Sequence, residues 1–305
     1  MKKLLISIFS FLFIGFLVFF MLNQHSNPSE EIERENHEPS QQSLYAAHEV
    51  DYAFQNAELL VTFDQGENWT HVPIEKELLF QGEYNGNEQE LIEGSYILTK
   101  DRVAFIYSEY VNKHDHSYVN VRLLYSLDRG KTWENVVVKP NSLPIRFRKV
   151  DFLNDDFGYI VLSSERVTSQ ELANMYVTYN GGESWQEVYS EVTRLIYAGG
   201  FTDEQTGFLS FGFINPDKPQ LYVTQDSGTT WYEANVQVPE KYNEIFLIAE
   251  TPFNEEDYLA VLINQGPSGD YLGGKVKGKF ISKDSGKTWE FSTEVSPEQD
   301  DSTYE

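Results

Sequence analysis

Ser282-Lys283-Asp284-Ser285-Gly286-Lys287-Thr288-Trp289 is the stretch that decides the fold, because the chain repeats it. Similar stretches begin at Thr62, Ser126, Thr178 and Thr224, and the five tryptophans of the chain each close one of the five copies. Successive copies have their third positions 64, 52, 46 and 58 residues apart. A period near 50 residues indicates one supersecondary unit that is repeated. The shared residues of the copies are Asp64, Gly66, Trp69, Asp128, Gly130, Trp133, Asn180, Gly182, Trp185, Asp226, Gly228, Trp231, Asp284, Gly286 and Trp289.

Each copy predicts a tight turn between two strands. The Asp or Asn side chain can accept hydrogen bonds from the backbone N–H groups that follow it, and the Gly two places later adopts a positive φ without strain. A Ser or Thr before the Trp can add a hydroxyl to the turn, and only the first copy has Asn68 there instead. Apolar and β-branched runs flank every copy. The sequence therefore predicts five β-hairpins.

The pattern resembles the Asp-box, or BNR repeat, of sialidase-type β-propellers, and it is similar to the propellers of photosystem II assembly factors and sortilin-type receptors. The resemblance covers residues 45–295. Two segments, Phe152–Tyr159 and Phe201–Phe208, also resemble the turn between the first two strands of a blade in such propellers. The resemblance implies an all-β protein with a five-bladed β-propeller, six blades being the alternative. It also implies that the box residues are structural. We expect residues 290–295 to complete the first blade, since few residues precede its hairpin.

The N-terminus predicts a membrane anchor. Residues Leu4–Leu22 carry no charge and, as a helix, would span roughly 29 Å, about the thickness of the hydrocarbon core of a bilayer. Lys2 and Lys3 precede the run, so residues 1–22 are expected to form a signal anchor that leaves the remainder outside the cytoplasm. A cleaved signal peptide, which would make the protein secreted, is the alternative. Residues 23–44 predict a disordered acidic linker, and residues 296–305 an acidic tail.

Composition restricts the classes of partner. The formal charge is −25, with 48 acidic and 23 basic side chains, and such a field repels the phosphates of nucleic acids. The chain has no cysteine, which excludes disulfides, thiolate metal sites and a catalytic cysteine. His114 and His116 have the spacing of part of a metal site but lie in a predicted hairpin loop. We expect no metal and no cofactor.

The residues that the resemblance implies for sialidase activity are absent. Sialidases hold the substrate carboxylate with three arginines from separate blades, and no arginine follows Arg194 in this chain. Their early R-I-P motif is also absent, because Pro144-Ile145-Arg146 runs in the opposite order. Paired carboxylates such as Asp155 and Asp203 lie in predicted turns. We therefore assign no catalytic residues.

Two functions follow. The first is a membrane-anchored extracytoplasmic propeller that binds a protein or glycan partner without catalysis, and the alternative is a divergent glycoside hydrolase or lyase that acts on cell-wall or host polysaccharide. Carboxylates and aromatic side chains gathered on the propeller axis would favour the alternative, and apolar side chains there would favour the first. The predicted ligand face consists of Arg146, Arg148, Arg194, Tyr197, Lys241 and Tyr242.

Overall fold

A computed structural model describes residues 48–297, except 85, 113, 169, 213 and 215. These residues belong to one compact unit, Leu44–Glu305. The predicted anchor at residues 1–22, the linker at 23–44 and residues 298–305 of the predicted tail lie outside the described residues. No helix within the described part is long and apolar enough to cross a membrane.

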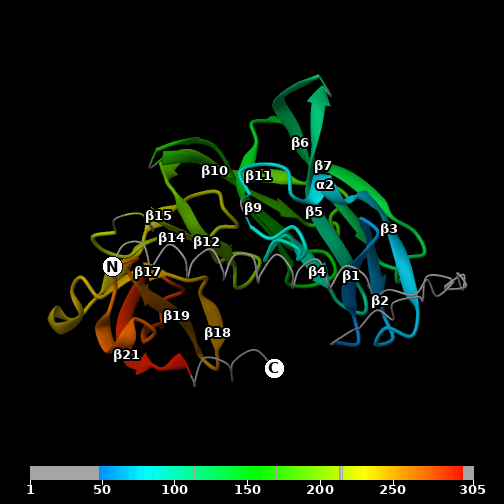
Figure 1. The fold of residues 1–305 in the computed structure, drawn as a ribbon. Helices are drawn as coiled ribbons and strands as arrows, with labels where there is room; N and C mark the ends of the chain where they lie inside the picture. Colours follow the sequence, from blue (N-terminus) through cyan, green and yellow to red (C-terminus); the bar gives the residue numbers. More distant parts are fainter. Residues whose placement is uncertain are drawn as a thin grey trace, which may run out of the picture. The chain divides into compact units, whose positions relative to one another are not determined.

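The described residues form five sheets that succeed one another along the chain (Figure 1). Helical structure is limited in this part to α2 (Lys76–Leu79) and to the short 3-10 helices η1 (Glu240–Tyr242) and η2 (Tyr271–Gly273). The first sheet holds β1 (Asp51–Gln55), β2 (Glu58–Thr62) and β3 (Trp69–Glu75). The second holds β4 (Tyr96–Leu98), β5 (Val103–Asn112), β6 (Asp115–Ser126) and β7 (Glu134–Ser142). The third holds β8 (Ile145–Phe152), β9 (Gly158–Val167), β10 (Gln170–Thr178) and β11 (Gln186–Arg194).

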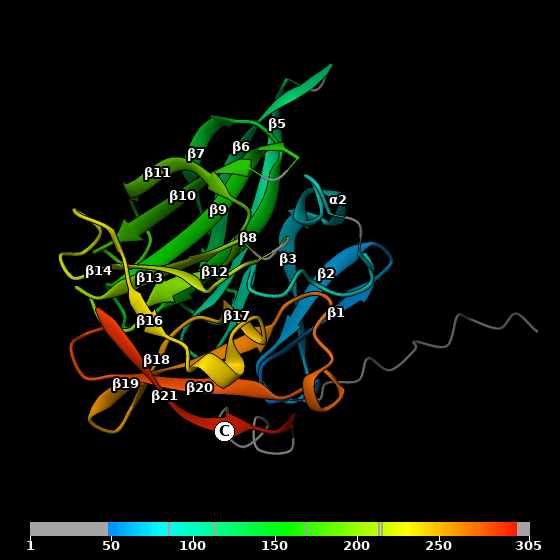
Figure 2. The ribbon, with the colours of Figure 1, turned by 90° about the vertical axis from the view of Figure 1, so that its left-hand side faces the viewer.

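The last two sheets are joined by a strand that crosses from one to the other (Figure 2). The fourth sheet holds β12 (Ile196–Phe201), β13 (Gly207–Phe211), β14 (Gln220–Thr224) and β15 (Tyr232–Glu233). The fifth holds β17 (Phe246–Ala249), β18 (Phe253–Glu255), β19 (Tyr258–Gln265), β20 (Lys277–Ser282), β21 (Thr288–Val295) and, parallel to β21, β16 (Asn235–Gln237).

This order of strands is that of a β-propeller, in which small antiparallel sheets repeat about a common axis. The second, third and fourth sheets each run through four antiparallel strands in chain order. A hydrophobic cluster lies between each pair of consecutive sheets from the first to the fifth. All five repeats connect two neighbouring strands, namely β2–β3, β6–β7, β10–β11, β14–β15 and β20–β21. The predicted all-β class and the five hairpins are therefore confirmed.

The expected pairing of the two chain ends is wrong for the described strands. β21 lies in the fifth sheet, antiparallel to β20 on one side and parallel to β16 on the other. The N–H of Asn235 donates to the carbonyl oxygen of Lys287 at 2.8 Å and so begins the β16–β21 pairing. β16 pairs with residues 288–290 and β20 pairs with residues 290–295, so β21 belongs to the fifth sheet, and the first sheet has three described strands, β1, β2 and β3.

Each repeat is held by the same set of hydrogen bonds, as the last copy illustrates. The Ser282 hydroxyl donates to Asp284 Oδ1 at 2.8 Å and accepts from the N–H of Gly286 at 2.9 Å. Asp284 Oδ1 also accepts from the N–H of Thr288 at 2.9 Å. In the first copy Asn68 replaces the usual hydroxyl, and its amide donates to Asp64 Oδ2 at 2.7 Å. This substitution therefore preserves the turn.

The box glycines also allow neighbouring sheets to approach closely. A Cβ added to Gly286 would lie 2.4 Å from the Phe208 ring, and one added to Gly228 would lie 2.6 Å from Val188 Cβ. In both cases the contacted residue belongs to the preceding sheet. Gly286 has a φ of 84°, and the residue before it, Ser285, has a φ of 56°. Each turn thus contains two successive left-handed residues, of which only the second is always glycine.

Candidate functional site: the central cavity

The first strands of the third and fourth sheets, β8 and β12, together with residues that precede β4 and follow β17, line a cavity of about 810 Å³, which we call the central cavity. β4 contacts β8, β8 contacts β12, and β12 contacts β17, so these strands are arranged in series around it. Three acidic side chains line the cavity together with aromatic ones from three sheets. The acids are Glu93, Asp151 and Glu250, and the aromatic residues are Phe147, Tyr159, Tyr197, Phe201 and Phe253.

One wall is formed by β8, whose alternation brings Lys149 and Asp151 to the same side of the strand. Lys149 Nζ donates to Thr251 Oγ1 at 3.2 Å, and so links β8 to the residues that follow β17. Burial lowers the pKa of the Lys149 ammonium, although the neighbouring carboxylates of Asp151 and Glu93 oppose this shift. The hydroxyl of Tyr159 donates to Asp151 Oδ2 at 3.2 Å, and burial raises the pKa of this phenol well above its usual value. This wall therefore carries both signs of charge.

A second part of the lining is organised around Glu250, which follows β17. Lys277 Nζ lies 2.9 Å from Glu250 Oε1, and the amide of Asn264 donates to the same oxygen at 2.7 Å. The Asn264 amide also donates to the hydroxyl of Tyr197 at 3.3 Å. The side chain of Glu250 is 25% exposed, so its carboxylate is held in place and still accessible from the cavity.

These side chains have the chemistry that carbohydrates require. Carboxylates accept hydrogen bonds from sugar hydroxyls, and aromatic rings offer apolar faces against which a sugar ring can pack. A pair of carboxylates can also act as acid and base, or as acid and nucleophile, on a glycosidic bond. No group of three or more His, Cys, Asp or Glu residues suited to a metal ion occurs among the described residues.

The predicted ligand face is divided between several places. Arg148 and Tyr197 both line the central cavity, and Tyr197 is 36% exposed there. The guanidinium of Arg148 is directed away from the cavity, because it donates to the carbonyl oxygens of Leu79 and Gln81, and burial lowers its pKa to about 10. Tyr197 is therefore the member of the predicted set whose side chain best suits a ligand in this cavity.

The remaining predicted residues make contacts within the protein. Arg146 forms a bidentate ion pair with the fully buried Glu171, the closer contact being 2.6 Å. Arg194 donates to the carbonyl oxygen of Ile214 at 3.0 Å. Lys241 Nζ lies 4.3 Å from the ring centre of Tyr242, and this ring is buried in the cluster between the fourth and fifth sheets.

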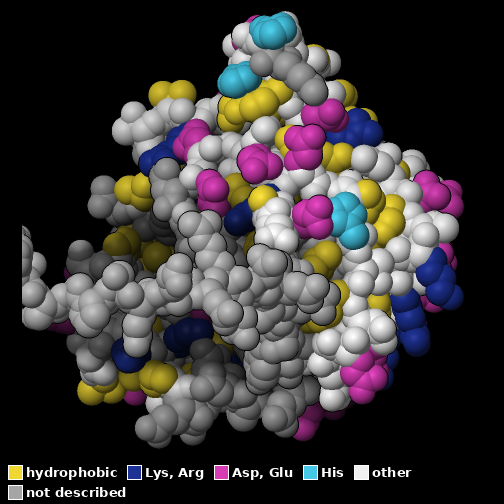
Figure 3. Space-filling model, turned by 45° about the vertical axis from the view of Figure 1, so that its right-hand side comes forward, with side chains coloured by type: hydrophobic (Ala, Val, Ile, Leu, Met, Phe, Trp, Pro, Cys, Tyr) yellow, Lys and Arg dark blue, Asp and Glu magenta, His cyan; other side chains and the backbone are white. Residues whose placement is uncertain are grey.

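The other sequence candidates lie in turns and in an exposed hairpin. Asp203 Oδ1 accepts from the N–H groups of Gln205 and Thr206 in the β12–β13 turn, and Asp155 occupies the corresponding β8–β9 turn. The ring of His116 stacks on Tyr110 with ring centres 4.1 Å apart. Acidic side chains are spread over the face shown in Figure 3, with Lys and Arg side chains between them.

The sequence alone did not indicate that Lys149, Asp151, Glu250 and Glu93, which precedes β4, share a site. No local motif marks these residues, because they meet only when the first strands of several sheets converge. The one available signal was the alternation of polar side chains along 145–152, a strand otherwise rich in apolar residues.

Comparison with known proteins finds distant structural similarity only. No protein-family model matches the sequence, and no curated protein matches it. Among solved structures, a GH43_1 enzyme from Xanthomonas citri is similar with a TM-score of 0.36 and 10% identity, over 70% of this chain and 74% of that one. A family 117 glycoside hydrolase from Zobellia galactanivorans gives a TM-score of 0.39 and 12% identity, over 72% and 77% of the two chains. An ancestral GH74 enzyme gives 0.42 and 14% identity over 82% of this chain and 31% of its own. The fold assignment rests on the strand order described above, not on these similarities.

Proposed function

We propose that the protein is a five-bladed Asp-box propeller that binds a carbohydrate in the central cavity and hydrolyses it as a glycoside hydrolase. The observation that carries the proposal is the gathering of Glu93, Asp151 and Glu250 with aromatic side chains on one cavity. An axis filled by apolar side chains would have favoured binding without catalysis. Carboxylates and aromatic side chains gathered on one cavity are typical of a binding or active site.

Glu250 is the proposed base or nucleophile. Lys277 and Asn264 both contact its carboxylate and hold it in a fixed orientation. Asp151 or Glu93 would then supply the proton to the leaving oxygen. Tyr197 would offer its ring to the sugar, since its hydroxyl is anchored by the same Asn264 amide that contacts Glu250.

Hydrolysis of a panel of aryl glycosides and polysaccharides tests this proposal. Glu250→Gln, Asp151→Asn and Glu93→Gln each remove one cavity carboxylate with little change of shape. Loss of an acid or base typically lowers the rate by about 10²- to 10⁴-fold, so at least two of the three variants should fall in this range. Asp155→Asn, in the exposed β8–β9 turn, is the matched control. Turnover that survives all three cavity substitutions would refute the assignment.

Binding without catalysis is the second candidate function. Asp151 and Glu250 already have hydrogen-bond partners in the cavity wall, an arrangement that also suits two acceptors that only hold sugar hydroxyls. A glycan retained by the protein and weakened by Tyr197→Ala, with no hydrolysis of any substrate, would favour this function. A protein partner recovered from envelope extracts without any glycan affinity would favour protein binding instead.

We further propose that the propeller is held at the outer face of a cell membrane by residues 1–22. The uncharged run after Lys2 and Lys3 supports this proposal. Fractionation of cells provides the test, because deletion of residues 4–22 should release the protein from the membrane fraction. A propeller that remains in the membrane fraction after this deletion would contradict the proposal.

A further inference from the structure

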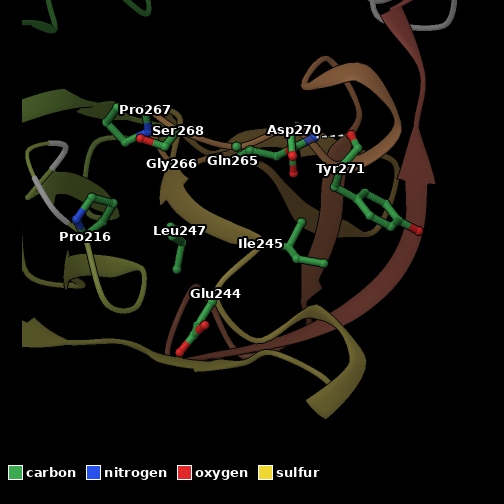
Figure 4. Close-up of a pocket in the computed structure, with 11 residues that line it drawn as sticks. Pro216, Glu244, Ile245, Leu247, Gln265, Gly266, Pro267, Ser268, Asp270 and Tyr271 are labelled. Atoms are coloured by element: carbon green, nitrogen blue, oxygen red, sulfur yellow. Dashed lines mark hydrogen bonds between the residues drawn. The ribbon is translucent and has the colours of Figure 1, made fainter.

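A second, smaller pocket lies at the other end of β17 from Glu250. It has a volume of about 280 Å³ and lies between the fourth and fifth sheets (Figure 4). Leu247 and Ile245 form one side of it, and Gln265 with the turn Gly266–Asp270 lies opposite. Pro216, from the β13–β14 connection, closes one end. We call it the loop pocket.

Gln265 is an unusual wall residue because its side-chain oxygen has no hydrogen-bond donor among the residues that the structure describes. The side chain is 92% buried, since 8% of the residue is exposed, and Oε1 is fully enclosed without a partner among the described residues. The amide cannot be turned to solve this, since its nitrogen donates to the carbonyl oxygens of Tyr271 and Val276, both at 2.9 Å. A buried acceptor without a partner costs free energy, and any hydrogen-bond donor that reaches it removes this cost.

A glycine turn covers Oε1. A Cβ added to Gly269 would lie 2.9 Å from Oε1 and 2.4 Å from Gln265 Cβ, so Gly269 covers the oxygen closely. The turn is closed by the N–H of Gly269, which donates to the carbonyl oxygen of Gly266 at 2.8 Å. A ligand donor therefore reaches Oε1 only if this turn moves outward.

The charged groups of the loop pocket are all acidic. Asp270 and Glu244 line it, and neither forms an ion pair with a described Lys or Arg. The pocket therefore combines apolar side chains with a carboxylate at the rim and an unsatisfied acceptor in the wall. A ligand that matches it needs an apolar body and several N–H donors with a positive charge.

We propose that the loop pocket binds a small amphipathic amine. Its apolar body would pack against Leu247, Ile245 and Pro216, and its ammonium group would donate to the Asp270 carboxylate and to Gln265 Oε1. The loop pocket is separate from the central cavity, so amine binding here can be tested independently of carbohydrate hydrolysis.

Calorimetric titration of the full chain with 2-phenylethylamine tests the proposal, with 2-phenylethanol as the uncharged analogue. Saturable binding of the amine and at least tenfold weaker binding of the alcohol are expected. Asp270→Asn should weaken amine binding by about tenfold, the effect of losing a hydrogen bond to a charged group. Asp257→Asn, in the exposed β18–β19 turn, removes an equal charge outside the pocket and should change nothing.

A variant that fills the pocket completes the test. A Cβ added to Gly266 would lie 3.1 Å from Leu247 Cδ1 and 3.5 Å from Pro216 Cγ, and Gly266 does not have a positive φ. Gly266→Val should abolish amine binding. Gly266→Ala, which is included because the larger valine could unfold the sheet, should weaken amine binding. Equal affinity for amine and alcohol, equal effects of Asp270→Asn and Asp257→Asn, or no saturable binding of the amine would each overturn the proposal.

Discussion

Replacement of Gly286 by alanine tests whether the box turns hold consecutive sheets together. The added methyl group would lie 2.4 Å from Cε1 of Phe208 and 2.5 Å from its Cζ, and the Phe208 ring is fully buried. A left-handed conformation costs a residue with a Cβ about 1–2 kcal/mol, and overpacking a core costs about 1–3 kcal/mol. The free energy of unfolding should therefore fall by about 2–5 kcal/mol.

Gly273→Ala is the matched control, because Gly273 has the same φ of 84° but a Cβ there would meet nothing within 4 Å. It should cost only the conformational part, about 1–2 kcal/mol. Urea unfolding followed by tryptophan fluorescence measures both, and the Trp289 ring lies 5.9 Å from that of Phe208. Equal losses in the two variants would refute the idea that the glycine is needed for contact between sheets.

Three further substitutions probe the same framework. Hydrogen bonds from the N–H of Thr132 and then from its hydroxyl lower the pKa of Asp128 to about 2. The ionised Asp128 therefore stabilises the folded protein fully above pH 4, and this stabilisation is lost as the pH falls towards 2. In Asp128→Asn the melting temperature should depend less on pH over this range. Trp289→Ala empties a fully buried site and should cost about 3–5 kcal/mol in chemical unfolding. Arg102 stacks 3.7 Å over Phe152 and donates to two carbonyl oxygens of the third sheet, so Arg102→Lys should cost about 1–3 kcal/mol, and an unchanged urea midpoint would contradict this.

The hairpins were predictable because their cause is local. An Asp or Asn that caps a turn, a glycine with positive φ and flanking apolar runs are all visible within about twenty residues of sequence. Two details of the turn were not visible. The first residue, such as Ser282, bonds both Asp284 and Gly286, and the fourth residue is left-handed even where it is Ser285 or Arg129. Neither detail follows from residue propensities, because a serine or arginine at the fourth position does not by itself indicate a left-handed conformation.

The central cavity was not predictable because its cause is not local. Lys149 and Thr251 are 102 residues apart in the sequence and are brought to 3.2 Å only when the third and fifth sheets are in place. Arginines attracted attention as potential ligand groups, yet Arg146 and Arg148 are used to bond a buried carboxylate and backbone carbonyls. The pairing of the chain ends failed for a similar reason, since nothing in residues 235–237 indicates that they cross to the next sheet.

The position of β21 between two strands has a mechanical consequence. Its hydrogen bonds to β20 and β16 run across the strand, so a force that pulls the C-terminal end along the strand loads both ladders in shear. Bonds loaded together resist more force than bonds opened one after another. A pull on Val295 therefore acts on a strand that is paired with β20 as far as Val295 and with β16 at residues 288–290, so tension also reaches the fourth sheet through β16.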